Sequence, residues 1–152
     1  MPIPSPARAA TRRPRILVTG ASGQIGFELA RLLPAHGDVT ALTRQQFDLA
    51  QPDAIVETMR ALQPDLVVNA AAYTAVDLAE RERDAAFAVN AKGPEVLASE
   101  AKRAGTVLIH YSTDFVFDGR ATEPYPEDAP AAPLNVYGAS KLEGERAIAA
   151  IG

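Results

Sequence analysis

The segment Val18–Gly26, with the sequence VTGASGQIG, constrains the fold of this chain more than any other. It follows an apolar, β-branched run and places Gly20, Gly23 and Gly26 directly before an amphipathic pattern. Glycine lets a backbone approach a ligand closely, and the free N–H groups at the start of a helix attract anions. This strand–turn–helix junction is typical of dinucleotide phosphate sites, but glycine-rich turns also occur without a ligand, so both interpretations stay open here.

Apolar and amphipathic runs alternate along the rest of the chain, which predicts repeated β-α units. Strands are expected over residues 15–19, 39–43, 66–69 and 106–110, with a further short strand over 47–49. Helices are expected over 24–33, 52–62, 77–83, 84–104 with an interruption near 92–94, and 136–150. The strands at 66–69 and 106–110 are apolar almost throughout, as strands buried on both faces are. The expected fold class is α/β, a doubly wound parallel sheet of Rossmann type.

The domain boundaries follow from composition and from the number of strands. Residues 1–14 are expected to form a disordered tail, and 15–152 an NAD(P)-binding Rossmann domain. Doubly wound sheets usually have about six strands or more, so we expect a C-terminally truncated fold with the substrate domain absent. The strand at 106–110 would then be an edge, although its apolar character suits the interior, and the isolated chain would be weakly active or inactive and prone to aggregate.

Composition excludes several classes of function. A net charge of -4 over 152 residues leaves no basic stripe for nucleic acid. The chain has no cysteine, which excludes thiolate chemistry and is compatible with a cytoplasmic location. No apolar run approaches a membrane span, and no metal-ligand spacing occurs. His36 is expected in a helix-ending turn, and His110 is expected to be a hydrogen-bonded structural residue.

Tyr137 and Lys141, in the segment VYGASKLEGE, are spaced to share one face of the expected helix. An ammonium group beside a phenol favours the phenolate and lowers a pKa that is ordinarily ~10. Such a tyrosine can donate a proton to a developing alkoxide near neutral pH. The alternative is a partly buried tyrosine beside a solvated lysine, and the pair taken alone favours that alternative.

Two further polar segments follow expected strands. Ser112, Thr113 and Asp114 come directly after the strand at 106–110, and in open α/β sheets a hydroxyl at that end can hydrogen-bond a substrate carbonyl. The segment NAAAYT at 69–74 is small enough for a flat cofactor to lie against it, and from there Thr74 could reach the nicotinamide or the substrate. A capping turn and an alanine-rich strand exit without ligands are the alternatives.

Taken in order, the glycine turn, NAAAYTAVD, AVNAKGP with Asn90, STDFVFDG and YGASKLEGE resemble the extended short-chain dehydrogenase/reductase superfamily. Within it they are similar to the dTDP-4-dehydrorhamnose reductase family, over residues 15 to about 150. The resemblance implies hydride transfer from a reduced nicotinamide to the C4 ketone of dTDP-4-dehydro-L-rhamnose, in dTDP-rhamnose biosynthesis. The implied partner is this small nucleotide sugar, and the resemblance is compatible with a homodimer of the full-length form.

The resemblance also assigns roles to residues. It makes Tyr137 the general acid, and Lys141 the residue that holds the nicotinamide ribose and tunes Tyr137. Thr113 would donate a hydrogen bond to the substrate carbonyl, with Thr74 and Asp114 also at the substrate. The cofactor would lie along Gly20, Gly23, Gln24, Ile25, Gly26, Asp48, Leu49, Ala70, Ala71 and Ala72, beside Tyr137 and Lys141.

The choice of cofactor depends on the end of the second strand. An acid there accepts the ribose 2′-hydroxyl of NAD, and an arginine suits a 2′-phosphate. The strand runs into Arg44 with no acid at its tip, while Asp38 lies at the opposite end. The expected cofactor is therefore NADPH, with NADH tolerated; Arg44 as a solvated surface charge is an equal alternative.

The chain departs from the family in two ways, and other functions stay open. Phe115 stands where the family usually has tyrosine, so a hydroxyl is lost. The family's C-terminal half, which recognises much of the sugar nucleotide, is absent from this sequence. The alternatives are a non-catalytic cofactor-binding or regulatory module, similar to the regulatory subunit of methionine adenosyltransferase, and a related nucleotide-sugar epimerase or dehydratase.

Overall fold

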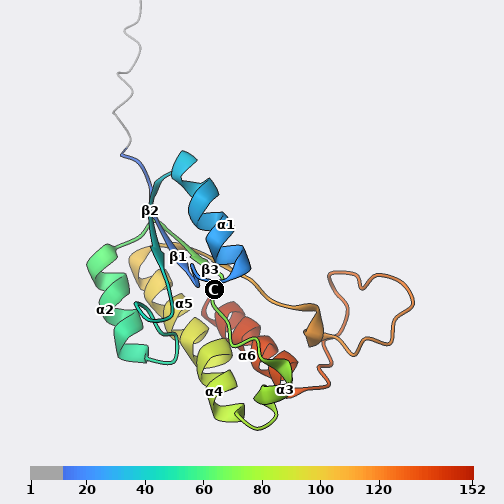
Figure 1. Ribbon diagram of the computed structural model, residues 1–152. Helices are drawn as coiled ribbons and strands as arrows, with labels where there is room; N and C mark the ends of the chain where they lie inside the picture. The colour runs from blue at the N-terminus through green and yellow to red at the C-terminus, as the bar shows by residue number, and fades with distance from the viewer. Residues whose placement is uncertain (1–11) are drawn as a thin grey trace, which may run out of the picture.

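A four-stranded parallel sheet forms the centre of the computed structural model, which describes residues 12–152 (Figure 1). The strand order is β2-β1-β3-β4. The strands are β1 Arg15–Thr19, β2 Asp38–Leu42, β3 Leu66–Asn69 and β4 Val107–His110. The register places Val18 beside Ala41 on one side and Val68 on the other. This parallel sheet with its flanking helices confirms the predicted α/β fold class.

Helices cover the two faces of the sheet (Figure 1). Their bounds are α1 Gln24–Leu32, α2 Pro52–Leu62, α3 Val76–Ala79, α4 Arg83–Phe87, α5 Gly93–Ala104 and α6 Val136–Ile151, with short 3₁₀ turns η1 Leu33–Ala35 and η3 Asp114–Val116 and a π-helical turn η2 Ala88–Lys92. The alternation of side chains along β1 divides the core. Ile16 and Val18 pack toward Leu29 of α1, whereas Leu17 packs with Ile55 of α2.

The helical run after β3 differs from the prediction. The helix expected over 77–83 is the single turn α3, and the interruption expected near 92–94 is no break. The chain instead passes from α4 through the π-helical turn η2 into α5, which has Pro94 in its first turn. Proline is tolerated there because that N–H would lack an intrahelical partner in any case. The π-helical turn contains the buried Asn90, and such turns often occur at functional sites.

The short strand predicted over 47–49 is wrong, because this segment forms turns. The N–H of Phe47 donates to the carbonyl of Thr43 (2.9 Å), and the N–H of Gln51 donates to the carbonyl of Asp48 (3.0 Å). Phe47 and Leu49 are buried in the core on the α2 side of the sheet. These apolar side chains are therefore buried from within a turn. A short apolar run alone does not distinguish a buried turn from a strand.

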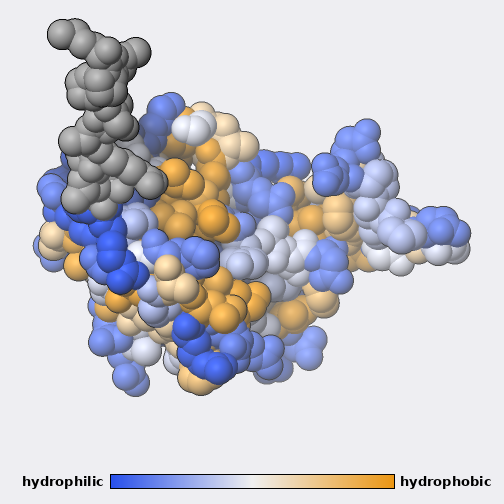
Figure 2. Space-filling model, turned by 90° about the horizontal axis from the view of Figure 1, so that it is seen from above, coloured by the Kyte–Doolittle hydropathy of each residue, from blue (hydrophilic) through white to orange (hydrophobic). Residues whose placement is uncertain are grey.

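Strand β4 is the edge of the sheet in the described part of the chain, and its predicted burial is wrong. Val107 is 61% exposed and Ile109 is 46% exposed, although both were expected in a strand buried on both faces. Apolar residues thus remain at the surface, and Figure 2 shows hydrophobic areas gathered on the face seen from above. The expected position of this strand at the edge is confirmed, together with its unpaired side.

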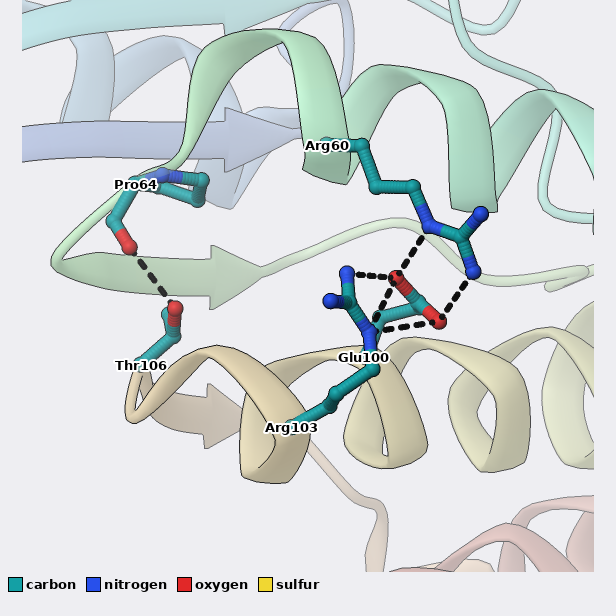
Figure 3. Close-up of polar contacts among 5 residues, drawn as sticks. All are labelled: Arg60, Pro64, Glu100, Arg103 and Thr106. Atoms are coloured by element: carbon teal, nitrogen blue, oxygen red, sulfur yellow. Dashed lines mark hydrogen bonds and ion pairs between the residues drawn. The ribbon is translucent and has the colours of Figure 1, made fainter.

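A cluster of polar contacts joins α2 to α5 (Figure 3). Both helices pack on the face of the sheet opposite to α1. The carboxylate of Glu100 lies between Arg60 (3.2 Å) and Arg103 (2.6 Å) and is almost fully buried. The hydroxyl of Thr106 donates to the carbonyl of Pro64 at 2.7 Å, which fixes the entry of β4 beside that of β3. The arginine hydrogen bonds lower the pKa of Glu100.

The contacts of the domain begin before residue 15. Arg12 pairs with Asp65 at 2.6 Å, and the carbonyl of Pro14 accepts a hydrogen bond from the N–H of Asp38 at 2.8 Å. The predicted disordered tail over 1–14 therefore differs from the structure at 12–14, while its residues 1–11 lie outside the described part. Among the helices of that part, none has the length and apolar character needed to cross a bilayer.

Candidate functional site

The glycine turn brings β1, α1 and the end of β3 into backbone contact. Gly20 has a φ of +70°, which favours glycine, and a Cβ there would lie 2.8 Å from the Cα of Ala71. At Gly26 a Cβ would lie 2.1 Å from the carbonyl oxygen of Gly20. A side chain at either position would push α1 or the Ala71 loop away, so the turn depends on both glycines.

Helix α1 begins at this turn and directs N–H groups toward the space beside it. Gly23 is its N-cap, and no side chain caps the helix. The N–H of Gly23 donates to the carbonyl of Gly20 (2.9 Å), whereas the next N–H groups begin the helix without intrahelical partners. An anion in front of α1 would satisfy them and would also be stabilised by the helix dipole.

A cavity of about 620 Å³ opens beside the glycine turn. Most of the predicted cofactor-binding residues line it, together with the predicted substrate residue Thr74: Gly20, Gly23, Gln24, Ile25, Arg44, Asp48, Leu49, Ala70, Ala71, Ala72 and Thr74. Of the predicted cofactor-binding residues, Gly26, Tyr137 and Lys141 are not among those that line it. Gly26 lies buried against Gly20. Four further lining residues were missed by sequence reasoning: Ser22, Phe47, Tyr73 and Val89.

Arg44 lies at the β2 side of this cavity. Its side chain is 75% exposed, and its Nε atom lies 3.5 Å from a carboxylate oxygen of Asp48. The other carboxylate oxygen of Asp48 accepts the N–H of Ala50 at 2.9 Å, so the aspartate is held within its turn. The guanidinium is therefore positioned at the cavity rim while its remaining donors stay available to a ligand.

Asn90 connects the cavity wall to helix α6. It lies in the π-helical turn η2, and its side-chain oxygen accepts the N–H of Tyr73 at 2.8 Å. Its amide nitrogen donates to the carbonyl of Tyr73 and to the hydroxyl of Ser140, both at 3.0 Å. Both amide hydrogens and one lone pair of the oxygen thus hold the wall loop against α6 in this buried position. Turns of the π-helical type often mark functional sites.

Tyr137 contacts the segment that follows Thr113, where η3 meets the first turn of α6. The Tyr137 ring packs edge-on against Phe115, with 5.5 Å between the centroids. A Cβ at Gly138 would lie 2.1 Å from the carbonyl oxygen of Phe115, so α6 touches this segment directly. The hydroxyl of Thr113 accepts the N–H of Phe115 (3.2 Å) and donates to Asp114 (3.2 Å).

Lys141 lies one helical turn beyond Tyr137 and is almost fully buried. Its amine donates to the carbonyl of Tyr111 at 2.6 Å and lies 3.3 Å from Nε2 of His110. Burial lowers the pKa of Lys141 to about 8. Within residues 12–152 no hydrogen bond joins this amine to the Tyr137 hydroxyl, so the predicted coupling of the two side chains stays a prediction.

The structure thus brings the predicted residues together in two neighbouring groups. The cofactor group lines the cavity, and Thr113, Asp114, Tyr137 and Lys141 lie on and beside α6. The latter four are not among the residues that line the cavity, and the two groups are joined through Asn90. The contact of His110 with Lys141, and that of Asn69 with His110, were not expected. The available signal was that each of these polar residues ends an apolar strand.

The fold and site together define an α/β protein with a Rossmann-type parallel sheet and a glycine-rich turn at its carboxyl edge. Residues 14–152 match the family described as the RmlD substrate binding domain. The chain belongs to this family.

Individual proteins similar to this chain are named as reductases. The chain is 52% identical to a dTDP-4-dehydrorhamnose reductase of Burkholderia thailandensis, over 91% of this chain and 46% of the relative. It is 45% identical to the dTDP-4-dehydrorhamnose reductase of Escherichia coli K12, over 88% of this chain and 46% of that relative. A crystal structure of the Bacillus anthracis reductase in complex with NADP superimposes with a TM-score of 0.88 at 36% identity, over 91% of this chain and 50% of that one. The chain spans about half the length of the curated relatives it matches.

Proposed function

We propose that this chain binds NADPH in the cavity and forms the cofactor-binding part of a dTDP-4-dehydrorhamnose reductase. One observation carries the proposal: the hydrogen bonds of Asn90 join the wall of the cavity beside the glycine turn to helix α6, which bears Tyr137 and Lys141. The similarity to reductases, one of them crystallised with NADP, supports the same conclusion. NADH is expected to be tolerated.

The residues of the cavity fit a dinucleotide. Gly20 and Gly26 allow the Ala71 loop and α1 to pack directly against the turn, which places the start of α1 at the cavity. The N–H groups at the start of α1 would bind the pyrophosphate, the alanines at 70–72 would lie along the cofactor, and Arg44 would pair with a 2′-phosphate. When bound, the reduced nicotinamide would supply the hydride for the C4 ketone of the nucleotide sugar.

The chain's own residues would supply the proton and hold the substrate. Tyr137 would donate its phenolic proton to the oxygen that becomes the C4 hydroxyl. Thr113 would donate a hydrogen bond to the same oxygen, which requires its hydroxyl to turn away from Asp114. Lys141 would hold the nicotinamide ribose, and Thr74 and Asp114 would contact the substrate.

Calorimetry and absorbance separate binding from turnover. Titration of this chain with NADPH is expected to show saturable binding, and an absence of binding would contradict the proposal. Loss of NADPH absorbance in the presence of dTDP-4-dehydrorhamnose tests the reaction. The variant Tyr137→Phe is expected to bind NADPH like the wild type while losing turnover. Binding by the wild type without any turnover, in this chain and in a version extended to the length of its relatives, would favour a regulatory module.

A further inference from the structure

Two successive residues after strand β4 are held by two side chains of helix α6. The amine of Lys141 donates to the carbonyl of Tyr111 at 2.6 Å. The carboxylate of Glu145 accepts a hydrogen bond from the hydroxyl of Ser112, which is the next residue. Lys141 and Glu145 are one helical turn apart, so they lie on the same face of α6. The helix therefore binds this segment at two adjacent points, directly before Thr113.

Thr113 begins the short turn η3, whose own hydrogen bonds are local. The N–H of Phe115 donates to the hydroxyl of Thr113 at 3.2 Å, and the N–H of Phe117 donates to the carbonyl of Asp114 at 3.0 Å. Among the hydrogen bonds that residues 112–117 make, the one from Ser112 to Glu145 reaches α6. Without it, packing of the Phe115 ring and backbone would hold η3 against the helix.

Glu145 also provides a negative charge near a buried amine. Lys141 is 2% exposed, and burial lowers its pKa to about 8, while the charge of Glu145 raises it against this larger effect. A pKa of about 8 leaves most of the amine charged at pH 7. His110 of β4 lies 3.3 Å from the amine and is uncharged at that pH, because burial and the Lys141 charge lower its pKa to about 4.

Other charged groups that pack on α6 make their contacts elsewhere. Glu80 accepts the N–H of the first helical residue at 2.8 Å, and Lys102 donates to a carbonyl in the last turn. Asp114 accepts the hydroxyl of the residue before it. Within residues 12–152 no hydrogen bond or ion pair joins any of these three to Lys141. The carboxylate that acts on the amine is therefore that of Glu145.

We propose that Glu145 is a positioning residue: it holds Ser112, and with it the segment that carries Thr113, and it keeps the amine of Lys141 charged. The inference rests on the proposed function, in which Thr113 binds the substrate carbonyl and Lys141 acts as an ammonium on the nicotinamide ribose and Tyr137. One carboxylate thus determines the position of one group of the site and the charge of another.

The variant Glu145→Gln tests the effect on charge, because glutamine keeps an oxygen for Ser112 and loses the negative charge. The titration midpoint of Lys141 is followed by its ¹³Cε shift. The chain has three lysines, and the variants Lys92→Arg and Lys102→Arg identify the other two signals. We expect the midpoint to fall by about 0.3 pH unit or more from the wild-type value.

Glu143→Gln is the matched control on the same helix. Glu143 is exposed and lies two residues from Lys141, a spacing at which helical side chains do not face each other. Its midpoint is expected to equal that of the wild type. A midpoint that does not fall in Glu145→Gln, or that falls as far in Glu143→Gln, would overturn the proposal.

The variant Ser112→Ala tests the hold on the segment, because it removes the hydroxyl and leaves the charges of Lys141 and Glu145 in place. We expect the amide N–H of Phe117, which is bonded within η3, to exchange with solvent about threefold faster or more. The midpoint of Lys141 should move less than in Glu145→Gln. Ser99→Ala removes an exposed hydroxyl from α5 and should leave this exchange rate unchanged. An unchanged rate in Ser112→Ala would also overturn the proposal.

Ser112 is exposed, so this second test does not depend on the folding of Glu145→Gln. All of these measurements are made without cofactor or substrate. A failure of the wild-type chain to bind NADPH would therefore count against the proposed function, whereas an unshifted midpoint or an unchanged exchange rate would count against this inference alone.

Discussion

Gly26 and Gly20 touch backbone to backbone: a Cβ atom at Gly26 would lie 2.1 Å from the carbonyl oxygen of Gly20. We expect Gly26→Ala to lower the free energy of unfolding by about 1–3 kcal/mol, because helix α1 must move outward to relieve the overlap. The same movement displaces the N–H groups at the start of α1, so NADPH binding should weaken as well. Urea denaturation and calorimetric titration measure the two effects.

Gly23→Ala is the matched control, since a Cβ there would lie 3.3 Å from the same carbonyl oxygen. Its backbone conformation, with φ -84° and ψ 167°, suits alanine. The contact can relax by a small shift, so Gly23→Ala should cost clearly less stability. Equal losses in the two variants would show that the close approach of α1 is not the cause.

Arg44 provides a test of cofactor choice. Its guanidinium lies at the cavity rim, 3.5 Å from Asp48. A lost charge-assisted contact with a 2′-phosphate costs about 1.5–3 kcal/mol, so Arg44→Ala should raise the Kd for NADPH about tenfold or more and change that for NADH little. Arg31→Ala is the control, because Arg31 pairs with Glu28 on α1. Equal losses for both cofactors in Arg44→Ala would assign Arg44 a role other than phosphate recognition.

Glu100 is expected to matter for stability. Its buried carboxylate accepts hydrogen bonds from Arg103 and Arg60, which join α5 to α2 (Figure 3). Glu100→Gln should lower the free energy of unfolding by about 1–2 kcal/mol, because charged hydrogen bonds are lost in a place that water reaches poorly. Urea denaturation measures the change.

Glu95→Gln serves as the control on the same helix. Its side chain is 44% exposed, against 10% for that of Glu100, and pairs with Lys92 at 2.9 Å. Exposed pairs of this kind contribute up to about 1 kcal/mol and often nothing measurable. Should Glu95→Gln cost as much as Glu100→Gln, burial would not explain the contribution of Glu100.

Local sequence predicted the parts of the fold that depend on pattern and glycine spacing. The turn at Gly20 needs a positive φ and a close approach, and both requirements are visible as glycine. Tyr137 and Lys141 were predicted on one helix from their spacing. These features are local, so the identity of the residues carries the information.

The failures concern features that depend on the partners of a segment. Phe47 and Leu49 are as apolar in a buried turn as they would be in a strand, and Ile109 is apolar at an exposed edge. The contact of Lys141 with His110 joins residues on different elements, at 3.3 Å. No spacing rule connects such residues, because the sheet register and the packing of α6 bring them together.

Stability should decrease as the pH falls between about 6.5 and 4, partly because of His110. Burial and the Lys141 charge lower the pKa of His110 from 6.5 to about 4. The folded state then binds fewer protons than the unfolded state in this window, which gives a slope of up to about 1.4 kcal/mol per pH unit. Urea denaturation across this range should show a smaller slope for His110→Gln. His36→Gln should keep the wild-type slope, and equal slopes in all three proteins would contradict the shift.

The exposed side of β4 should promote self-association of this chain. In the described residues β4 pairs only with β3, and Val107 and Ile109 present apolar side chains to solvent. Edge strands with apolar faces associate readily, whereas lysine on an edge opposes pairing through its charge. The double variant Val107→Lys/Ile109→Lys should therefore scatter less light at high concentration and keep its unfolding midpoint, because both side chains lie at the surface. Leu134→Lys, at an exposed loop position, is the control. If it reduced scattering as much as the double variant, general surface charge and not the strand edge would govern association.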